Sequence, residues 1–306
     1  MQQLTTPILF IIFNRPEITA KVFNQIKEVQ PTKLYVAADG PRKNKAGELQ
    51  LCEASREAVL SNITWNCEVR SLIRNENVGC KIAVSSAITW FFENEEQGII
   101  LEDDCLPDKS FFNFCNLLLE MYKDEESVMQ ISGCNLLGEN IKVDHSYYFS
   151  RMCHIWGWAT WRRAWKLYDI KMNRLNELFD NFEEISTDKR IKNYWSKVLN
   201  EVKENKIDTW DYQWVYSIWV NKGLVISPAV NMISNIGFGP DATHTVIMDK
   251  TVANLKANAI DIMKHPSSMR PNIAIDNYDM KKTVRTLSII QNIRIRASNI
   301  YKRFTL

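Results

Sequence analysis

The sequence predicts an α/β fold in which a mostly parallel sheet is flanked by helices. In the first half of the 306-residue chain, short apolar runs alternate with stretches of helical length. The apolar runs end in polar or turn-forming residues, and none approaches the roughly 18–20 residues that span a bilayer. This alternation is typical of parallel strands, because each parallel pair needs a long crossover connection, which is usually a helix.

The first apolar run, residues 8–13, is continuous, as expected for a strand that is covered on both faces. It ends at Asn14, Arg15 and Pro16, and a helix is expected to follow. Along the first half we expect strands at residues 8–13, 34–38, 67–74 and 98–101, and helices at residues 17–29, 49–60 and 82–92.

The strands of this predicted sheet are followed by polar turns. In a parallel sheet, ligands bind beyond the carboxyl ends of the strands. We therefore expect these turns to line one cleft. The turns are Asn14-Arg15-Pro16, Asp39-Gly40-Pro41, Asn77-Val78-Gly79 and Glu102-Asp103-Asp104.

The last of these turns places three carboxylates, Glu102, Asp103 and Asp104, at the tip of a buried strand. Adjacent like charges in such a place are unfavourable unless a positive charge neutralises them. A divalent cation does so well, because hard cations prefer oxygen ligands. Alternation along a strand would point Glu102 and Asp104 to one side and Asp103 to the other. The alternative is a solvated acidic turn.

The second half of the chain is rich in aromatic residues. Its tryptophans cluster within residues 156–165, 194–195 and 210–214, and closely spaced tryptophans are usually core or interface residues. Helices are expected at residues 175–182 and 189–204, with short strands at 225–227 and 231–234. A glycine-punctuated loop over residues 235–245 ends the predicted folded body.

Charge is distributed unevenly along the chain. The net charge is +2, yet seven basic residues and no acidic one follow Met280. The remainder is mildly acidic, which argues against a nucleic-acid partner. Residues 281–306 also carry apolar residues at helical spacing. Such a basic amphipathic helix can lie on an anionic membrane, or it can dock on its own body or on a partner subunit. These alternatives stay open.

The seven cysteines are scattered, odd in number and free of any C-x-x-C pair. This usage is typical of reduced thiols in a cytosolic protein, not of a disulfide framework or a zinc site. The N-terminal residues show no leader-like segment. We therefore expect a cytoplasmic protein, peripheral on the inner face of the membrane if the basic tail binds lipid.

Four motifs occur in an order that resembles one enzyme family. They are the strand that ends in Asn14-Arg15-Pro16, the Glu102-Asp103-Asp104 turn, Gly157-Trp158, and Trp210-Asp211 followed by Trp214. Together they resemble the GT-A-type glycosyltransferases, in particular bacterial family-2-like transferases and the N-acetylglucosaminyltransferase that begins complex N-glycans. The likeness covers about residues 7–245. The run from Trp156 to Arg163 is closer to the bacterial relatives, so the animal enzyme's substrates are not carried over.

The resemblance implies a GT-A Rossmann-like domain over residues 1–250, with a nucleotide-binding half (1–105) and an acceptor and catalytic half (106–250). Residues 251–306 would form a basic helical C-terminal extension. The implied activity is a metal-dependent, inverting transfer of a sugar from a nucleoside-diphosphate sugar, with a UDP-sugar favoured. The acceptor would be a hydroxyl of a glycan, glycolipid or glycoprotein, as in bacterial cell-surface glycan synthesis.

The resemblance also implies roles for individual residues around the donor. Asp104 would bind Mn²⁺ or Mg²⁺ directly, with Glu102 as a further ligand or holding metal-bound water. Asp103 would support the metal or the ribose, and Asp39 would bond the nucleoside. Arg15 and Arg74 are expected at the diphosphate, since a guanidinium forks onto phosphate oxygens. Asn14, Asn77, Gly79 and Trp158 complete the expected donor site.

An acceptor hydroxyl needs a base as it attacks the anomeric carbon. The resemblance points to Asp211, where flanking tryptophans could raise the carboxyl pKa, and Asp208 is the second choice. Alternatively, Asp211 caps a helix that starts at residue 212. His244 is the expected late metal ligand, and His154 is a weaker candidate. Trp156 or Trp158 is expected near a sugar.

Two other functions remain in view. A sugar-1-phosphate nucleotidyltransferase would share the sheet and the metal, but it would need a glycine-rich, basic phosphate loop where this chain has Asn14-Arg15-Pro16. An inactive carbohydrate-binding scaffold would not need Asp211 or His244.

Overall fold

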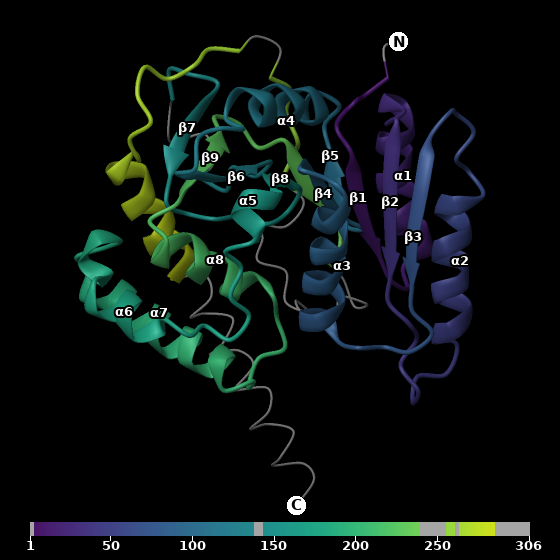
Figure 1. Cartoon of the computed structure of the whole chain (residues 1–306), viewed down its shortest axis with the longest axis horizontal. Coiled ribbons are helices and arrows are strands. Elements are labelled where there is room, and N and C mark those ends of the chain that lie inside the picture. The colour runs from purple at the N-terminus through teal and green to yellow at the C-terminus, as the bar shows by residue number, and fades with distance from the viewer. Residues whose placement is uncertain (1–2, 138–142, 239–254, 261–262, 285–306) are drawn as a thin grey trace, which may run out of the picture.

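An eight-stranded mixed sheet with the order β3-β2-β1-β4-β8-β6-β9-β7 forms the centre of the structure (Figure 1). This computed structural model describes residues 3–137, 143–238, 255–260 and 263–284. Within that part, β7 and β8 run against the other six strands. The strands of the sheet are β1 (Ile8–Ile12), β2 (Lys33–Ala38), β3 (Glu68–Ile73), β4 (Gln97–Glu102), β6 (Val128–Ser132), β7 (Tyr147–Ser150), β8 (Trp158–Trp161) and β9 (Leu224–Pro228).

Helices cover both faces of the sheet, and a separate two-stranded ribbon pairs β5 (Cys105–Pro107) with β10 (Ile233–Asn235) in antiparallel fashion. The helices are α1 (Pro16–Val29), α2 (Glu48–Leu60), α3 (Cys80–Asn94), α4 (Ser110–Met121), α5 (Arg162–Trp165), α6 (Leu175–Asp180), α7 (Lys189–Lys203) and α8 (Asp211–Val220), with a 3₁₀ turn at Phe182–Glu184. Residues 273–284 are also helical. None of the helices in the described ranges is long and apolar enough to cross a membrane.

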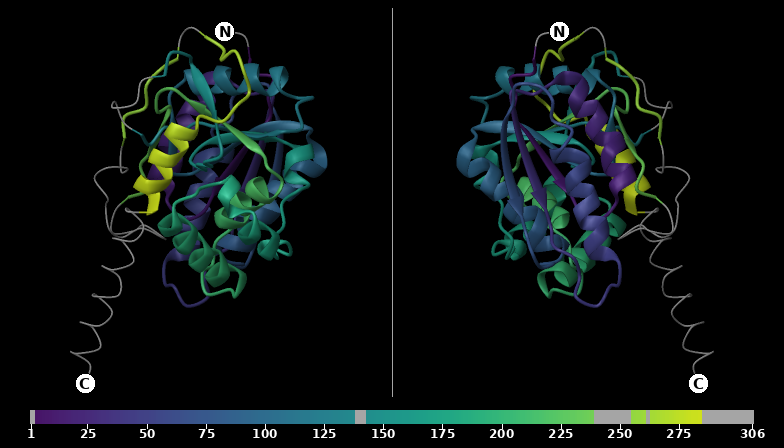
Figure 2. Two further views of the ribbon diagram at one scale, coloured as in Figure 1. Left: turned by 90° about the vertical axis from the view of Figure 1, so that its left-hand side faces the viewer. Right: turned by 90° about the vertical axis from the view of Figure 1, so that its right-hand side faces the viewer.

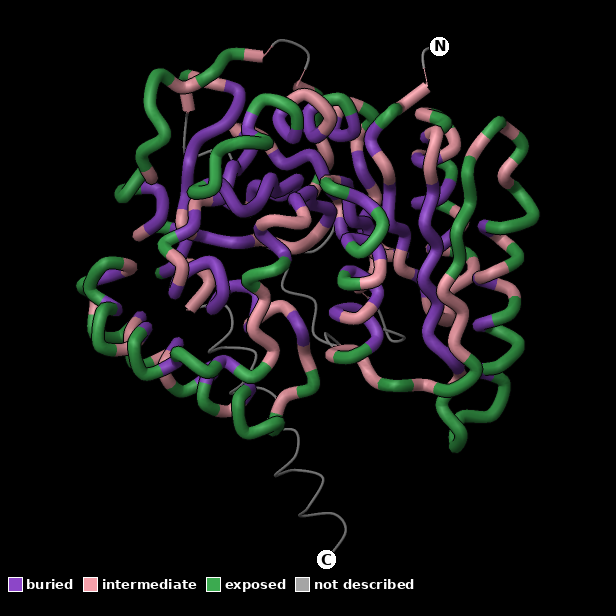
Figure 3. Tube along the Cα trace, in the orientation of Figure 1, coloured by how far each residue is buried: buried purple, intermediate pink, exposed green. Residues whose placement is uncertain are grey.

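The period-two alternation of β1 builds two cores, one on each face of the sheet. Ile8, Phe10 and Ile12 are buried in the core that α1, α2 and α4 complete. Leu9 lies in the opposite core, with side chains of α3, α7 and α8. Figure 3 shows the buried strands at the centre and the exposed outer segments around them. The continuous apolar sequence of β1 thus reflects burial on both faces.

Tryptophans hold β8 against the helices of the second half. The Trp158 side chain has 0% exposure, and its ring stacks on that of Trp210 with 5.8 Å between centroids. Trp214 of α8 lies 5.8 Å from the same ring, and Trp165 of α5 lies 6.2 Å from it. Fully buried aromatic rings of this size dominate core energetics.

The α/β class with a mostly parallel sheet is confirmed. The strands and helices expected in the first half occur with ends shifted by at most two residues. No element was expected between residues 105 and 150, where the structure has β5, α4, β6 and β7, nor were β8 and α5 expected. The strand expected at 231–234 lies at Ile233–Asn235 and belongs to the ribbon, not to the main sheet.

The helix at residues 273–284 packs on the body formed by the preceding residues (Figure 2). Met280 has 0% exposure and belongs to the core that contains α7 and α8. Ile275 packs against Leu137 and Tyr148, and the Asn272 amide donates to the Phe149 carbonyl at 2.9 Å. These residues fall within the expected basic extension, whose part from 285 to 306 lies outside the described residues.

Replacing Trp158 by alanine is expected to lower the free energy of unfolding by about 3–5 kcal/mol, because it leaves a cavity at a fully buried position. Urea denaturation followed by far-ultraviolet circular dichroism measures this change. Trp156→Ala is the matched control, since Trp156 lies two residues earlier and is partly exposed; it should cost less than half as much. Equal losses would contradict the placement of these two rings.

Candidate functional site

A cavity of about 660 Å³ lies where the carboxyl ends of β1, β2 and β4 meet the start of α8. Predicted site residues from five separate segments line it together. They are Arg15, Asp39, Arg74, Asn77, Gly79, Glu102, Asp103, Asp104, Asp208 and Asp211.

Arg15 lies against the acidic turn and compensates part of its charge. Its Nη2 group donates to Asp103 and lies 3.1 Å from Asp104 Oδ2. The Phe13 amide also donates to Asp103 Oδ2, at 3.2 Å. Burial raises the pKa of Asp103 to about 6, and the Arg15 charge opposes that rise. A residue of the first turn thus supplies a positive charge that the three carboxylates require.

The expected alternation of the three carboxylates is wrong. Strand β4 ends at Glu102, and Asp103 and Asp104 form a turn. Both aspartates can therefore contact the same guanidinium, which strict alternation would forbid.

Glu102 is different from the two aspartates. It follows Ile100 and Leu101 in β4, and Ile100 packs in the core of α3, α7 and α8; alternation places Glu102 on that same face. No hydrogen bond or ion pair joins its carboxylate to any residue of the described ranges. Burial, and then the charges of Asp104 and Asp103, raise the pKa of Glu102 to about 8.

Asp39, at the end of β2, organises the loop before α3. Its carboxylate accepts from the Gly40 amide at 2.9 Å and from Asn77 Nδ2 at 2.8 Å. The Val78 amide donates to the same carboxylate at 3.2 Å. A carboxylate has about four acceptor positions, so little capacity remains for a nucleoside. Burial raises the pKa of Asp39.

Asp208 caps the N-terminus of α3 from a distant part of the chain. Its Oδ2 accepts from the Cys80 amide at 3.1 Å and its Oδ1 from the Lys81 amide at 3.2 Å. Gly79 has φ +81°, and a Cβ there would lie 2.9 Å from Asp208 Oδ2. The second-choice base therefore has a structural task at the helix end.

Asp211 is the first residue of α8 and lines the same cavity as the nucleotide-half loops. The helix starts one residue earlier than expected, and its N-cap residue is Trp210, whose side chain makes no capping bond. The Asp211 carboxylate instead accepts a hydrogen bond from the Thr209 hydroxyl. The structure thus does not show Asp211 as the helix cap.

Three candidate residues within the described ranges do not line the cavity. Asn14 donates to Glu48 Oε1 at 2.9 Å, and Trp158 is enclosed in the tryptophan core. His154 pairs with Asp279 away from the cavity. His244 lies outside the described residues, so its predicted metal role stays a prediction.

The cavity also has walls that the sequence did not indicate. Arg42 lines it while pairing with Glu48, and Phe238 lies 5.7 Å from the Trp156 ring, edge to face. Gly237 passes so close to the acidic turn that a Cβ would lie 2.2 Å from Asp104 Oδ2. Glycine in the loop after residue 234 was the available signal for this close approach.

The residues around the cavity fit a hard divalent cation bound together with phosphate. Six carboxylates from the described ranges line the cavity, and Asp39 and Asp208 are bonded to the loop before α3 and to its first turn. Of the other four, Glu102, Asp103, Asp104 and Asp211, Arg15 pairs with only two. Mg²⁺ typically keeps several waters and binds one or two carboxylates plus substrate phosphates. In the described ranges, no three His, Cys, Asp or Glu side chains are grouped to hold a metal by themselves.

No protein-family model matches the sequence, and no curated protein matches it. Solved structures that match include UDP-glucose pyrophosphorylase complexed with UDP-glucose, at 8% identity and a TM-score of 0.37, over 73% of this chain and 90% of that chain. The apo form of UDP-glucose pyrophosphorylase matches at 8% identity and a TM-score of 0.39, over 76% and 93%. These values are too low to indicate the function of this chain.

The raised pKa of Glu102 predicts a pH-dependent stability in metal-free protein. Between its ordinary pKa of 4.5 and about 8, the folded state keeps the proton that the unfolded chain releases. The folded state then binds more protons, so stability falls as pH rises through this window. Asp103 and Asp276, whose pKa values burial raises to about 6, add to the fall at lower pH. Glu102→Gln should therefore remove the fall above about pH 6 and be more stable than the parent at pH 8 by about 1 kcal/mol or more.

Thermal unfolding in EDTA from pH 5 to pH 8.5 measures the effect. Glu53→Gln on the exposed side of α2 is the control and should keep the parent's pH dependence. An unchanged pH dependence in Glu102→Gln would contradict the assignment.

Proposed function

We propose that this protein is a glycosyltransferase that moves a sugar from a nucleoside-diphosphate sugar, with a UDP-sugar favoured, to a hydroxyl of a carbohydrate-bearing acceptor. The reaction would need Mn²⁺ or Mg²⁺ and would invert the anomeric configuration. The observation that carries the proposal is the cavity itself. It combines an under-compensated acidic turn at the end of β4 with a separate carboxylate, Asp211, on α8.

The nucleotide-half loops supply the donor side. Arg15 and Arg74 line the cavity, and Arg74 is oriented by a 2.8 Å hydrogen bond from its Nη2 to Ser86 Oγ. Guanidinium groups at these positions suit a diphosphate, because they offer paired donors in a fixed plane. The Asp39–Asn77 pair shapes the loop that would hold the nucleoside.

Glu102 and Asp104 would hold the metal ion, whose charge would stabilise the departing diphosphate. Glu102 is free of protein partners in the described ranges, so it can bind the ion without breaking an existing contact. Asp104 keeps one oxygen on Arg15, which would bring the guanidinium and the ion to the same phosphate group.

Asp211 would take the proton of the acceptor hydroxyl. Its bond from Thr209 orients the carboxylate and leaves acceptor capacity for a substrate. Trp156 and Phe238 on the cavity wall offer apolar faces for an acceptor or donor sugar. In this proposal Trp156, not Trp158, takes the expected place of an indole near a sugar.

Asp211→Asn should lower kcat by about 100-fold or more, because general-base catalysis contributes at least that much. UDP affinity should change by less than about twofold, since the nucleotide-half loops are untouched. Released nucleoside diphosphate measures turnover, and calorimetric titration with UDP measures binding. Asp208→Asn is the control, with a loss of about 1 kcal/mol in stability from the weakened helix cap and a smaller effect on kcat. Normal turnover of Asp211→Asn would refute the assigned base.

Mn²⁺ added with UDP should raise the melting temperature of the parent protein, because a ligand that binds only the folded state stabilises it. At 100 times its Kd the gain is about 2.7 kcal/mol. Glu102→Gln should lose most of this gain, and Glu53→Gln should keep it. An equal Mn²⁺-dependent rise in all three proteins would argue against a metal at Glu102.

A product assay separates the alternatives. Incubation with UDP-, GDP- and dTDP-sugars should release the nucleoside diphosphate in a metal-dependent reaction. Pyrophosphate released from UTP and a sugar 1-phosphate would instead indicate a nucleotidyltransferase. Binding of UDP-sugars without either product would indicate a scaffold.

A further inference from the structure

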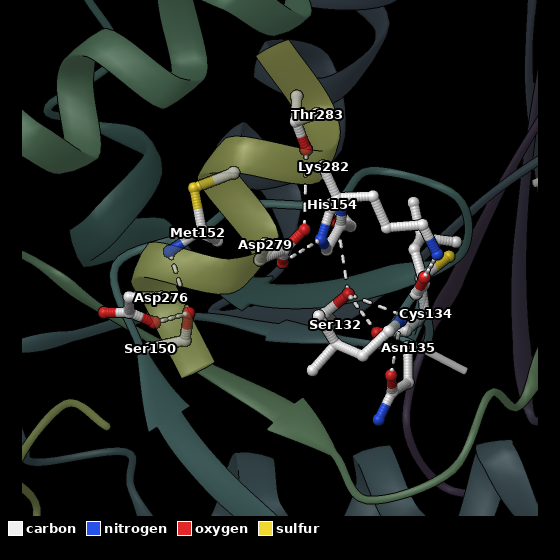
Figure 4. Close-up of polar contacts among 12 residues, drawn as sticks. Ser132, Cys134, Asn135, Ser150, Met152, His154, Asp276, Asp279, Lys282 and Thr283 are labelled. Carbon is white, nitrogen blue, oxygen red and sulfur yellow. Dashed lines mark hydrogen bonds and ion pairs between the residues drawn. The ribbon is translucent and has the colours of Figure 1, made fainter. Parts of the chain in front are cut away.

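The helix at residues 273–284 presents two buried aspartates to the body (Figure 4). Asp276 contacts the end of β7, and Asp279 contacts the loop between β7 and β8. Asp276 is 2% exposed and accepts from the Ser150 hydroxyl at 2.6 Å and from the Arg151 amide at 3.1 Å. Asp279 is 3% exposed, and its Oδ2 lies 2.8 Å from His154 Nε2. Neither aspartate lines the cavity, so the proposed reaction does not use them directly.

The contact between Asp279 and His154 is charge-assisted and enclosed. Their side chains are 5% and 13% exposed. The Thr283 hydroxyl lies 3.4 Å from the other Asp279 oxygen, and Lys282 Nζ donates to the Leu136 carbonyl beside them. Buried polar groups of this kind fix their surroundings when all partners are present, and each missing partner is costly.

His154 connects the Asp279 contact to the core that contains Trp214. Its backbone carbonyl accepts from Gln130 Nε2 at 2.7 Å and from the Ser132 hydroxyl at 3.2 Å. Gln130 is 0% exposed, and its Oε1 accepts from Trp214 Nε1 at 2.7 Å. Trp214 lies one turn after Asp211 on α8.

The same histidine also precedes part of the cavity wall. Ile155 and Trp156 follow it directly and line the cavity. The Trp156 carbonyl accepts from the Cys134 thiol at 3.0 Å, so this short segment is bonded to the β6 end at both His154 and Trp156.

We propose that Asp279 is a positioning residue for the site. Through His154 it holds the segment that carries Trp156, and through Gln130 and Trp214 it holds the first turn of α8, which carries Asp211. The C-terminal helix is thus part of the catalytic half, although none of its described residues lines the cavity. The expected loss of kcat rests on the proposed function, whereas the expected rise in hydrogen–deuterium exchange does not.

Asp276 provides a matched control on the same helix. It has the same side chain and similar burial, yet it contacts Ser150 and Arg151. The Ser150 hydroxyl also accepts from the Met152 amide at 2.8 Å, and the Arg151 carbonyl accepts from Trp219 Nε1 at the far end of α8 at 2.7 Å. Loss of Asp276 weakens helix docking without touching His154. Loss of Asp279 weakens docking and also removes the partner of His154.

The experiment compares Asp279→Ala, Asp279→Asn and Asp276→Ala in the full chain. Hydrogen–deuterium exchange of peptides covering 154–158 and 209–215 should rise at least fivefold in Asp279→Ala and less in Asp279→Asn, which keeps an acceptor for the histidine. In Asp276→Ala these peptides should exchange as in the parent. With the best nucleotide sugar of the panel, Asp279→Ala should lower kcat about tenfold and leave the donor KM within twofold.

Parent-level exchange of both peptides in Asp279→Ala would overturn the inference, and so would equal effects of Asp276→Ala. If the parent turns over no nucleotide sugar, the proposed function fails while the exchange data still decide the positioning role. If Asp279→Ala does not fold, His154→Ala removes the same contact from the other side. It should raise exchange in the same two peptides, and unchanged exchange there would equally overturn the inference.

Discussion

The pairing of Arg15 with Asp103 and Asp104 is the interaction on which the site depends. It places a positive charge at the point where β1 and β4 end side by side, and this charge lies against two adjacent aspartates. Breaking a buried pair of this kind typically costs about 3–5 kcal/mol, because a charge is left without compensation. The Gly237 segment closes over the same pair, so the chain that returns from β10 also takes its position from this contact.

The pairing also explains why Glu102 stands apart. Arg15 reaches the two turn residues but belongs to the α1 side of the sheet, whereas Glu102 points to the α3, α7 and α8 side. All three carboxylates of this acidic motif line the cavity. Arg15 compensates Asp103 and Asp104, whereas Glu102 forms no hydrogen bond or ion pair within the described ranges. The uncompensated carboxylate faces the cavity, where an incoming cation and phosphate can satisfy it. This division gives the cavity its polarity without any strained backbone at the acidic turn.

The first half was predicted well because its strands, turns and helices are each indicated by residues that are adjacent in the sequence. The continuous apolar run of β1, the turn at Asp39-Gly40 and the spacing of α1 and α3 each report burial or chain reversal directly. The convergence of Arg15, Asp39 and Glu102 follows from parallel topology alone. Contacts between distant residues could not be predicted in this way. Asp208 caps α3 across more than 120 positions, and the pairing of Asp279 with His154 spans a similar separation.

Trp156 and Trp158 show that local sequence can also fail to predict burial for residues that are close together in the chain. Trp156 and Trp158 lie two residues apart in one short segment. Trp158 is enclosed because it belongs to β8, which pairs with β4 on one side and β6 on the other. Residues 105–150 were harder to predict, because β6 and β7 are buried at every position and show no alternation. Their identity as helix or strand depends on the sheet that they join.

The docking of residues 273–284 has a consequence for the order in which the molecule is completed during synthesis. Every described residue that lines the cavity has been synthesised by Phe238, and domains generally fold from the N-terminus as the chain emerges. At that stage the place of Met280 in the second core is open, and His154 has no acidic partner. The second half therefore reaches its final packing only after the helix at residues 273–284 has left the ribosome, later than all the described residues that line the cavity.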